Sequence, residues 1–329
     1  MRAWVATRQG PPGEVLELLE VDRPTPAPGQ VSVRVELGGL NFADRMLIEG
    51  RYQERYEPPF IVGTEMVGWV EEVGEGATLS PGQRVAGFAG APTGAYAEYA
   101  LGVEEGLFAI PAELDAGAAL QLPVAYATAW LALHRVARVQ AGERLLVTAA
   151  AGSLGLALLR LAAAAGAEPF ALVGSEAKLA ACERAGARWS ALYKDPQLSE
   201  RLAELTGGGV DALLDSVGGE VWEACVRQLR PGGRAVTLGF SSGEIPSLAL
   251  NRLLLKNIAV GGLFVGGYMK SDPELVREAF VAVLDGCLNG AFEPDPVHEV
   301  PTDELFGALE RLTSRATIGK QALRWSEAN

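Results

Sequence analysis

The chain is poor in the side chains that bind soft metals, with two histidines and three cysteines among 329 residues. His134 and His298 lie far apart, and Cys182, Cys225 and Cys287 form no C-x-x-C pair. This distribution excludes a disulfide framework and a four-cysteine zinc site. We therefore predict no metal site, and we predict that each cysteine is a small buried apolar residue rather than a reactive thiol.

Basic charge is also scarce. Lysine and arginine number 28 against 41 acidic residues, which gives a formal net charge of −13. This balance argues against nucleic acid or an anionic membrane as the main partner. No uninterrupted apolar run is long enough for a membrane span, and the first residues lack the apolar segment of a signal peptide. We expect a cytoplasmic protein with a small-molecule partner.

The first 118 residues have the pattern of a β-rich domain. From Gln30 to Leu37 apolar and polar residues alternate, which predicts a half-buried strand. Glycine and proline turns separate the further strand candidates, which are Met66–Val73, Gln83–Phe88, Ala95–Ala100 and Leu107–Ile110. Short strands with regular turn signals predict a small barrel-like domain.

The later part of the chain alternates strands with helices. The strand candidates are Arg144–Thr148, Glu168–Val173, Trp189–Tyr193, Val210–Val217, Arg234–Phe240 and Ile258–Phe264. This alternation predicts a parallel, doubly wound sheet with strand order 3-2-1-4-5-6. The predicted domains are 121–267 for this sheet and 1–120 with 268–329 for the β-rich domain, onto which the tail from Tyr268 folds back.

The most informative stretch runs from Arg144 to Gly174 and has the order strand, small-residue turn, helix, strand. The turn, Ala149–Gly155, opens a Leu/Ala-rich helix, and its residues Gly152, Ser153 and Leu154 are expected to lie against the pyrophosphate. Small residues let a dinucleotide pyrophosphate approach the backbone, and the helix N-terminus supplies free N–H groups. A glycine turn alone is weak evidence, but its place between a strand and a helix is the context that such a motif needs.

The second strand of this unit ends without an acid, at Gly174 and Ser175. A site specific for NAD usually places Asp or Glu there to bind the ribose 2′-hydroxyl. The small pair followed by Lys178 leaves room and positive charge for a 2′-phosphate. We therefore predict NADPH as the cofactor. The alternative of NADH stays open, because Glu176 could bind a ribose 2′-hydroxyl.

Further cofactor candidates follow the later strands, because ligands of such sheets bind at the carboxyl ends of the strands. For Phe240 and Phe264, a packing role in the hydrophobic core is an equal alternative to cofactor binding. The candidates are Ser216, Val217, Gly239, Phe240, Ser241, Phe264 and Val265.

Several separated segments match the motif set of one enzyme superfamily, in order and over nearly the whole chain. They are Asn41–Asp44 with Gly50–Tyr52, Pro59–Glu65 with Gly68, Gly82–Val85, Pro123–Ala129, the glycine turn, Asp215–Gly219, Pro231–Arg234 and Leu253–Asn257. With them the chain resembles the medium-chain dehydrogenase/reductase superfamily, in its zinc-independent, zeta-crystallin-like NADPH:quinone oxidoreductase branch. The resemblance implies an α/β protein with a GroES-like β-rich barrel domain plus a Rossmann doubly wound parallel sheet.

The resemblance also implies site residues. Asn41 borders cofactor and substrate in this family, Thr128 holds the nicotinamide carboxamide, and Ser175, Lys178 and Tyr193 surround the 2′-phosphate. Zinc-dependent relatives carry His at the position of Thr64 and a Cys near Asn41, which supports zinc-free chemistry here. Structural alternatives remain open: a turn residue for Asn41 and a buried helix residue for Thr128.

Tyr52 is the second catalytic candidate beside Asn41, as donor of a hydrogen bond or proton to the acceptor oxygen, with a barrel-surface aromatic as the alternative. For Asp44 and Glu65 we expect structural hydrogen bonding. Family members often carry a second tyrosine where this chain has Met46, which places a quinone-stacking site in doubt.

The predicted activity is hydride transfer from NADPH to a quinone or an α,β-unsaturated carbonyl, because such acceptors are already electrophilic and need no metal. Two alternatives stay open, an enoyl-thioester reductase and a non-catalytic NADPH-binding protein. The apolar last strand, Ile258–Phe264, is expected at a sheet edge and predicts a homodimer.

Overall fold

The computed structural model describes residues 1–90 and 92–325. The chain divides into two compact units, one formed by Met1–Val124 with Pro294–Asn329 and the other by Ala125–Glu293. The segment 268–293 thus belongs to the second unit, whereas the sequence analysis placed it with the first. The reason is packing: α11 (Pro273–Leu288) lies against α4 (Ala127–Trp130), and Phe292 stacks on Tyr126 with ring centroids 4.9 Å apart.

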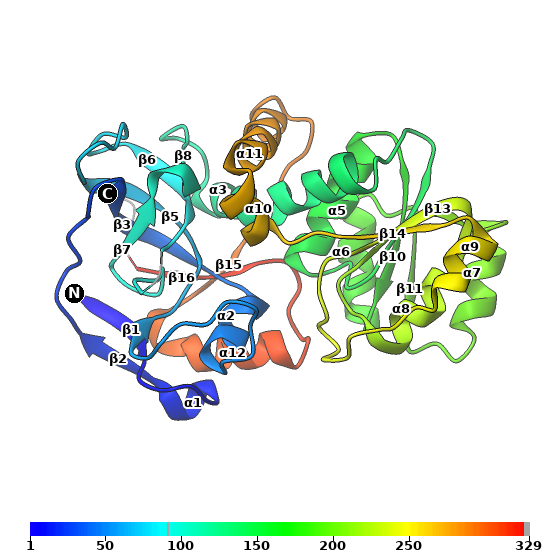
Figure 1. Cartoon of the computed structure of the whole chain (residues 1–329), viewed down its shortest axis with the longest axis horizontal. Coiled ribbons are helices and arrows are strands. Elements are labelled where there is room, and N and C mark those ends of the chain that lie inside the picture. The colour runs from blue at the N-terminus through cyan, green and yellow to red at the C-terminus, as the bar shows by residue number, and fades with distance from the viewer. Residues whose placement is uncertain (91, 326–329) are drawn as a thin grey trace. The chain divides into compact units, whose positions relative to one another are not determined.

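The first unit contains two sheets (Figure 1). The smaller has the order β2 (Leu16–Glu20), β1 (Arg2–Ala6), β4 (Phe60–Ile61). The larger has the order β15 (His298–Val300), β16 (Gln321–Arg324), β3 (Gln30–Leu40), β5 (Glu65–Val73), β6 (Arg84–Phe88), β8 (Leu107–Ala109), with β7 (Tyr99–Val103) also paired to β3. The helices of this unit are α1 (Pro12–Val15), α2 (Phe42–Ile48), α3 (Ala116–Gln121) and α12 (Leu305–Thr313).

The expectation of a half-buried strand from Gln30 to Leu37 is wrong. β3 is buried on both faces, and even Ser32 and Glu36 are almost inaccessible to solvent. The strand pairs with β5 along one edge and with β7 and β16 along the other, so it lies inside the sheet, and of its polar residues Ser32, Arg34 and Glu36 only Arg34 keeps partial exposure. Glu36 is tolerated there because the Arg84 guanidinium donates a 2.9 Å hydrogen bond to its carboxylate.

The second unit contains one parallel sheet, which confirms the predicted order 3-2-1-4-5-6. Its strands, from one edge to the other, are β11 (Trp189–Leu192), β10 (Glu168–Val173), β9 (Arg144–Val147), β12 (Val210–Asp215), β13 (Leu229–Thr237) and β14 (Ala259–Gly262). Besides α4 and α11, the helices are α5 (Ser153–Ala164), α6 (Leu179–Arg184), α7 (Leu198–Thr206), α8 (Gly219–Val226), α9 (Leu250–Lys256) and α10 (Val265–Ser271). Figure 1 shows α5 to α9 beside the sheet and α10 and α11 apart from it.

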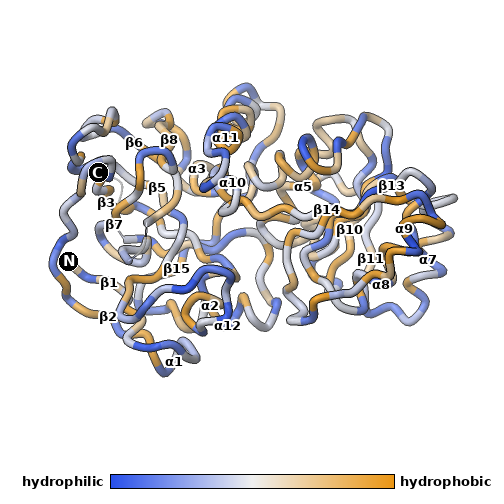
Figure 2. The backbone as a smooth tube through the Cα atoms, in the orientation of Figure 1, coloured by the Kyte–Doolittle hydropathy of each residue, from blue (hydrophilic) through white to orange (hydrophobic). Residues whose placement is uncertain are grey.

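The central strands β9, β10 and β12 are apolar along most of their length and are buried on both faces, as in parallel sheets covered by helices. Figure 2 shows hydrophobic segments within this sheet. α5 lies directly against the turn after β9. A Cβ added at Gly155 would lie 2.5 Å from the carbonyl oxygen of Ala149, so only glycine permits this approach.

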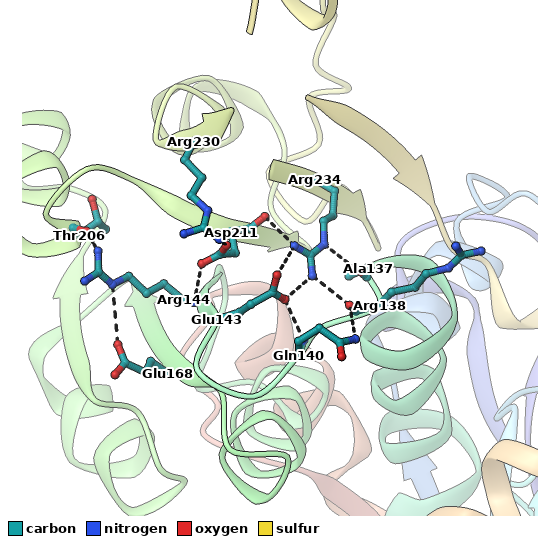
Figure 3. A network of polar contacts seen from close by, with 10 residues as sticks. All are labelled: Ala137, Arg138, Gln140, Glu143, Arg144, Glu168, Thr206, Asp211, Arg230 and Arg234. Atoms are coloured by element: carbon teal, nitrogen blue, oxygen red, sulfur yellow. Dashed lines mark hydrogen bonds and ion pairs between the residues drawn. The ribbon is translucent and has the colours of Figure 1, made fainter. Parts of the chain in front are cut away.

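A network of polar contacts joins the amino ends of the strands in the second unit (Figure 3). The Arg234 guanidinium makes an ion pair with Glu143 and donates to the carbonyl oxygens of Ala137 and Arg138. The Arg144 backbone N–H donates to the Asp211 carboxylate at 2.9 Å. These bonds tie the loop before β9 to β12 and β13, at the edge opposite to the carboxyl ends.

One helical segment in the described part of the chain, Ala116–Val136, is long and apolar enough to cross a membrane by length and composition. Most of its apolar window, 83%, is buried inside the structure. Two π-helical turns, Leu122–Tyr126 and Leu131–Val136, flank α4 within it.

Candidate functional site

The parallel sheet brings most of the predicted site residues to one edge of the second unit. Because all its strands run in the same direction, the loops after them share the carboxyl edge. The sheet order places these loops side by side in the order Tyr193, Gly174–Lys178, Gly152–Leu154, Ser216–Val217, Gly239–Ser241 and Phe264–Val265. Asn41 and Tyr52 belong to the first unit.

The turn after β9 presents the N-terminus of α5 to this edge. Gly152 precedes the helix with an extended backbone, and Ser153 and Leu154 are its first residues. The Ser153 hydroxyl oxygen is buried and has no hydrogen-bond partner within the described residues. A buried hydroxyl and free backbone N–H groups at the start of a twelve-residue helix fit a phosphate oxygen as their acceptor.

The ends of β10 and β11 form the neighbouring part of the edge. A Cβ added at Gly174 would lie 2.9 Å from the Tyr193 hydroxyl, so the tyrosine occupies the space that a larger residue at 174 would need. Ser175 has an extended backbone and precedes the single turn Glu176–Lys178. The strand end therefore carries no carboxylate at 174 or 175, and a cation follows within one turn.

Between β9 and β12, two buried polar residues that the sequence analysis did not include in the site join adjacent strand ends. The Thr148 hydroxyl donates to the Asp215 carboxylate at 2.6 Å, and the Gly218 N–H donates to its other oxygen at 2.8 Å. The Ser216 N–H donates to the Thr148 hydroxyl at 3.0 Å. Burial raises the pKa of Asp215. The only signal in the sequence was an acid that closes an apolar strand.

The loops after β12 and β13 run beside each other. The Ser241 N–H donates to the Ser216 carbonyl at 3.0 Å, and a ring carbon of Phe240 lies 3.2 Å from where a Cβ of Gly218 would be. Phe240 is partly exposed and Phe264 is 41% exposed. Neither phenylalanine is fully buried, and a contact to the cofactor stays a prediction for both.

Two further predicted residues lie on helices of the second unit. Val265 begins α10, directly after Phe264. Thr128 lies in α4, which packs against α5, and its side chain is buried. Burial agrees equally with a packing role and with a contact to the nicotinamide, so the role of Thr128 stays a prediction.

In the first unit, Asn41 is the centre of a hydrogen-bonded cluster at the start of α2. The Lys320 ammonium donates to Asn41 Oδ1 at 2.8 Å, and Asn41 Nδ2 donates to Glu65 Oε2 at 3.2 Å. Lys320 and Glu65 also form a direct ion pair. The Asn41 backbone N–H donates to the Asp44 carboxylate at 2.7 Å. Asp44 and Glu65 thus have the structural hydrogen bonds expected of them.

Asp44 is completely buried at the base of this cluster. It accepts hydrogen bonds from the Thr64 and Tyr96 hydroxyls, each at 2.9 Å. Burial raises the pKa of Asp44 to about 6, although these bonds and the charge of Lys320 oppose the rise. Tyr96 fits because Gly63, with φ of +101°, leaves room for its ring.

Tyr52 follows α2 in sequence and is partly buried. Burial, followed by the charges of Glu54 and Asp44, raises the pKa of Tyr52 to about 12. The phenol therefore keeps its proton at neutral pH, and the protonated phenol is the form that can donate a hydrogen bond.

The cluster around Asn41 does not fit a zinc ion. No group of three His, Cys, Asp or Glu side chains with metal-binding geometry occurs within residues 1–90 and 92–325. Thr64 donates its hydroxyl to Asp44, and the Lys320 ammonium already contacts the Asn41 amide oxygen. Hard oxygen donors beside a fixed cation are a poor zinc site.

Lys320 is the functional candidate that sequence reasoning missed. A lysine is seldom fully buried, and nothing near position 320 indicates that it pairs with a residue 255 positions away. The pairing follows from the strand register, in which Gln321 on β16 lies opposite Leu40 on β3.

Comparison with known proteins agrees with this architecture. Residues 27–112 match the family model described as alcohol dehydrogenase GroES-like domain, and residues 153–282 match that of zinc-binding dehydrogenase. Quinone oxidoreductase-like protein 2 of Bos taurus is 36% identical over 94% of this chain and 90% of its own length. A 2-haloacrylate reductase of a Burkholderia species is 31% identical over 98% of both chains.

A solved structure leads to the same group. The quinone oxidoreductase of Thermus thermophilus, which was also solved in complex with NADPH, superposes with a TM-score of 0.83. It is 36% identical and covers 99% of this chain and all of its own. The two-unit fold, the parallel sheet with its glycine turn and these near full-length relatives place the chain in the medium-chain dehydrogenase/reductase superfamily, among the quinone oxidoreductases.

Proposed function

We propose that this protein is an NADPH-dependent oxidoreductase that transfers hydride to a quinone or an α,β-unsaturated carbonyl without zinc. The observation that carries the proposal is the end of β10, where Gly174 and Ser175 replace an acid and Lys178 follows. A relative with the same fold, solved with NADPH, supports the choice of cofactor.

The second unit supplies the residues that would hold the dinucleotide. The N-terminus of α5 with Ser153 would bind the pyrophosphate. Ser175, Lys178 and Tyr193 would surround the 2′-phosphate, where a cation is favourable. The nicotinamide half would lie across the loops after β12, β13 and β14, with Thr128 as the partner of its carboxamide.

When bound, NADPH supplies a hydride. In an enone, a hydride added at the β-carbon would place negative charge on the carbonyl oxygen, and a proton from water would complete the saturated ketone. Asn41 and Tyr52 each present a hydrogen-bond donor suited to such an oxygen, because the amide is held in one orientation and the phenol keeps its proton. No step requires a metal, since the acceptor is already electrophilic.

The names of the relatives indicate the acceptor class. Quinones and haloacrylates share a carbon–carbon double bond conjugated to a carbonyl, and one relative is named for each. We therefore place the substrates of this chain among activated alkenes and quinones.

The test is oxidation of NADPH by the purified protein in the presence of quinones, enals, haloacrylates and enoyl thioesters, with and without EDTA. We expect turnover of the quinones or enals that is unchanged by EDTA. Turnover of thioesters alone would move the chain to the enoyl-thioester reductases. Tight NADPH binding with no turnover of any acceptor would identify a non-catalytic binding protein, and loss of activity with EDTA would overturn the zinc-free mechanism.

A further inference from the structure

A buried ion pair lies directly beneath the Asn41 amide. The Lys320 and Glu65 side chains are 1% and 0% exposed, and the lysine ammonium contacts Glu65 Oε2. Such a pair gains little stability after both ions lose their water, so its retention calls for another reason. The backbone makes room for it: a Cβ at Gly39 would lie 2.5 Å from Glu65 Oε2 and 3.0 Å from Lys320 Nζ.

The pair fixes which way the Asn41 amide faces. Its oxygen accepts from the Lys320 ammonium at 2.8 Å, and its nitrogen donates to the Glu65 carboxylate at 3.2 Å. A rotation of the amide by half a turn would place its NH₂ group against the cation and its oxygen against the anion. Both attractive contacts would become repulsive, so one orientation is enforced.

The same contacts leave one donor for use elsewhere. An asparagine amide has two N–H bonds, and Glu65 takes one of them. The cation on the amide oxygen withdraws electron density and strengthens the remaining N–H as a donor. Lys320 and Glu65 are fully buried, whereas Asn41 is partly exposed. The amide is therefore the route by which the buried charge can act on a bound molecule.

We propose that Lys320 is a positioning residue for the reaction: with Glu65 it holds and polarises the Asn41 carboxamide, so that the free N–H of the amide donates to the acceptor's carbonyl oxygen as hydride is added. This inference rests on the proposed function. It assigns to Lys320, far along the chain from Asn41, a role in turnover rather than in binding of the dinucleotide, since the predicted cofactor residues other than Asn41 lie in the second unit.

The decisive variant replaces both ions, Lys320→Met with Glu65→Gln, because removal of one alone would leave a buried uncompensated charge. We expect the double variant to fold and to bind NADPH with an unchanged Kd. Its kcat should fall by about tenfold to a hundredfold with little change in KM, less than the loss of about a hundredfold to a thousandfold for a deleted oxyanion donor, because the Asn41 amide itself remains. A folded double variant with the kcat of the wild type would overturn the inference.

The chain offers a matched control. Glu36 and Arg84 form another buried ion pair in the same unit, with side chains 4% and 6% exposed, and their ion pair does not include Asn41. The variant Arg84→Met with Glu36→Gln should change stability and leave kcat within about twofold of the wild type. An equal loss of kcat in this control would show that the effect is general weakening of the unit, which also overturns the inference.

A mutant cycle that combines Asn41→Ala with the two charge-removing substitutions shows whether Lys320 acts through Asn41 or directly on the substrate. If Lys320 acts through Asn41, the two charge-removing substitutions should cause no further loss of kcat in the Asn41→Ala background. Full additivity would overturn the inference while leaving the proposed function standing. A wild-type protein without turnover would instead overturn the proposed function, and the inference with it.

A measurement on the unaltered protein covers the case in which the double variant does not fold. The two Asn41 side-chain amide protons should exchange with solvent at different rates, slowly for the one that Glu65 accepts and faster for the other. Equal rates for the two protons, measured by NMR, would show that the amide is not held and would overturn the inference.

Discussion

We propose that single side chains at the end of β10 determine which dinucleotide the second unit prefers. Lys178 lies within one turn of a strand end that carries no acid at 174 or 175. We expect Lys178→Ala to raise the Kd for NADPH about tenfold, the scale of one charge-assisted hydrogen bond, and to leave the Kd for NADH nearly unchanged. Fluorescence titration with both cofactors measures this.

Lys256→Ala is the control for that titration, because Lys256 is an exposed lysine of the same unit that donates to the carbonyl oxygen of Arg227, the residue after α8. It should affect neither cofactor. An equal weakening of NADPH and NADH by Lys178→Ala would contradict a role in reading the 2′-phosphate.

A second prediction at this scale concerns the pH dependence of stability. Burial raises the pKa of Asp44 from 3.8 to about 6, so between these values the folded protein holds a proton that the unfolded chain has lost. The contribution of Asp44 to the free energy of unfolding is therefore complete below the lower value and declines as the pH rises to about 6, by about 3 kcal/mol in total.

Denaturant unfolding of the wild type and of Asp44→Asn, at several pH values, isolates this term. The difference in unfolding free energy between the two proteins should shrink as the pH rises from about 4 to about 6 and stay constant above it. A difference that is independent of pH would show that Asp44 is ionised throughout the range.

Some residues of the candidate site could be predicted from the sequence and others could not, and the difference has a physical reason. The positions of Gly152, Gly174 and Ser216 after the strands were predictable, because a turn after a strand restricts residue type locally. Lys320 was not, because its burial depends on the register between β16 and β3, and register is set by long-range pairing rather than by neighbours in sequence.

At the scale of elements, the amino ends of the parallel strands depend on the arginine network of Figure 3. Arg234 and Glu143 are 19% and 18% exposed, and Arg234 also satisfies two backbone carbonyls. We expect Arg234→Ala to lower the unfolding free energy by about 2 to 4 kcal/mol without weakening NADPH binding, because the network lies at the edge opposite to the cofactor loops. Denaturant unfolding and cofactor titration measure the two quantities.

Two further variants sharpen this test. Arg234→Lys should restore little stability, since an ammonium cannot reproduce the planar fork that reaches both the carboxylate and the carbonyls. Arg201→Ala removes an exposed ion pair with Asp195 in the same unit and should cost less than about 1 kcal/mol. Equal losses for Arg201→Ala and Arg234→Ala would contradict the structural role of the network.

The presence of strands and helices was easier to predict from the sequence than the solvent exposure of their faces. The parallel sheet was evident because apolar strands alternate regularly with helices, and that pattern is local. The burial of both faces of β3 was not predictable, because alternation of apolar and polar residues indicates one solvent-exposed face. Only a partner distant in sequence, such as Arg84 for Glu36, allows the polar face to be buried. The domain assignment of 268–293 failed to follow from sequence for the same reason: α11 packs on α4, more than a hundred residues earlier.

At the scale of the whole molecule, we propose a homodimer formed at the open edge of the parallel sheet. β14 pairs with β13 alone among the described strands, and the preceding helix α9 exposes Leu250, Leu254 and Leu255 by 77% or more. An unpaired strand beside exposed leucines favours association with a second copy. We expect a dimer by light scattering at micromolar concentration.

The variant Leu254→Glu with Leu255→Glu should be a folded monomer, because burial of two carboxylates at the contact is unfavourable. Val281→Glu is its control: this residue of α11 is 49% exposed and lies outside that edge. A monomeric wild type, or dissociation by the control as well, would contradict the proposed interface.

The discontinuity of the first unit has a consequence for how the protein is made. The second unit is one continuous stretch, whereas the first needs residues on both sides of it. During translation, Glu65 and Asn41 leave the ribosome long before Lys320 does. The later-synthesised unit can therefore acquire its native structure first, and the earlier one can neutralise its buried carboxylate only after Lys320 has been synthesised. A chain released before Lys320 is made would therefore contain a complete second unit and an incomplete first unit.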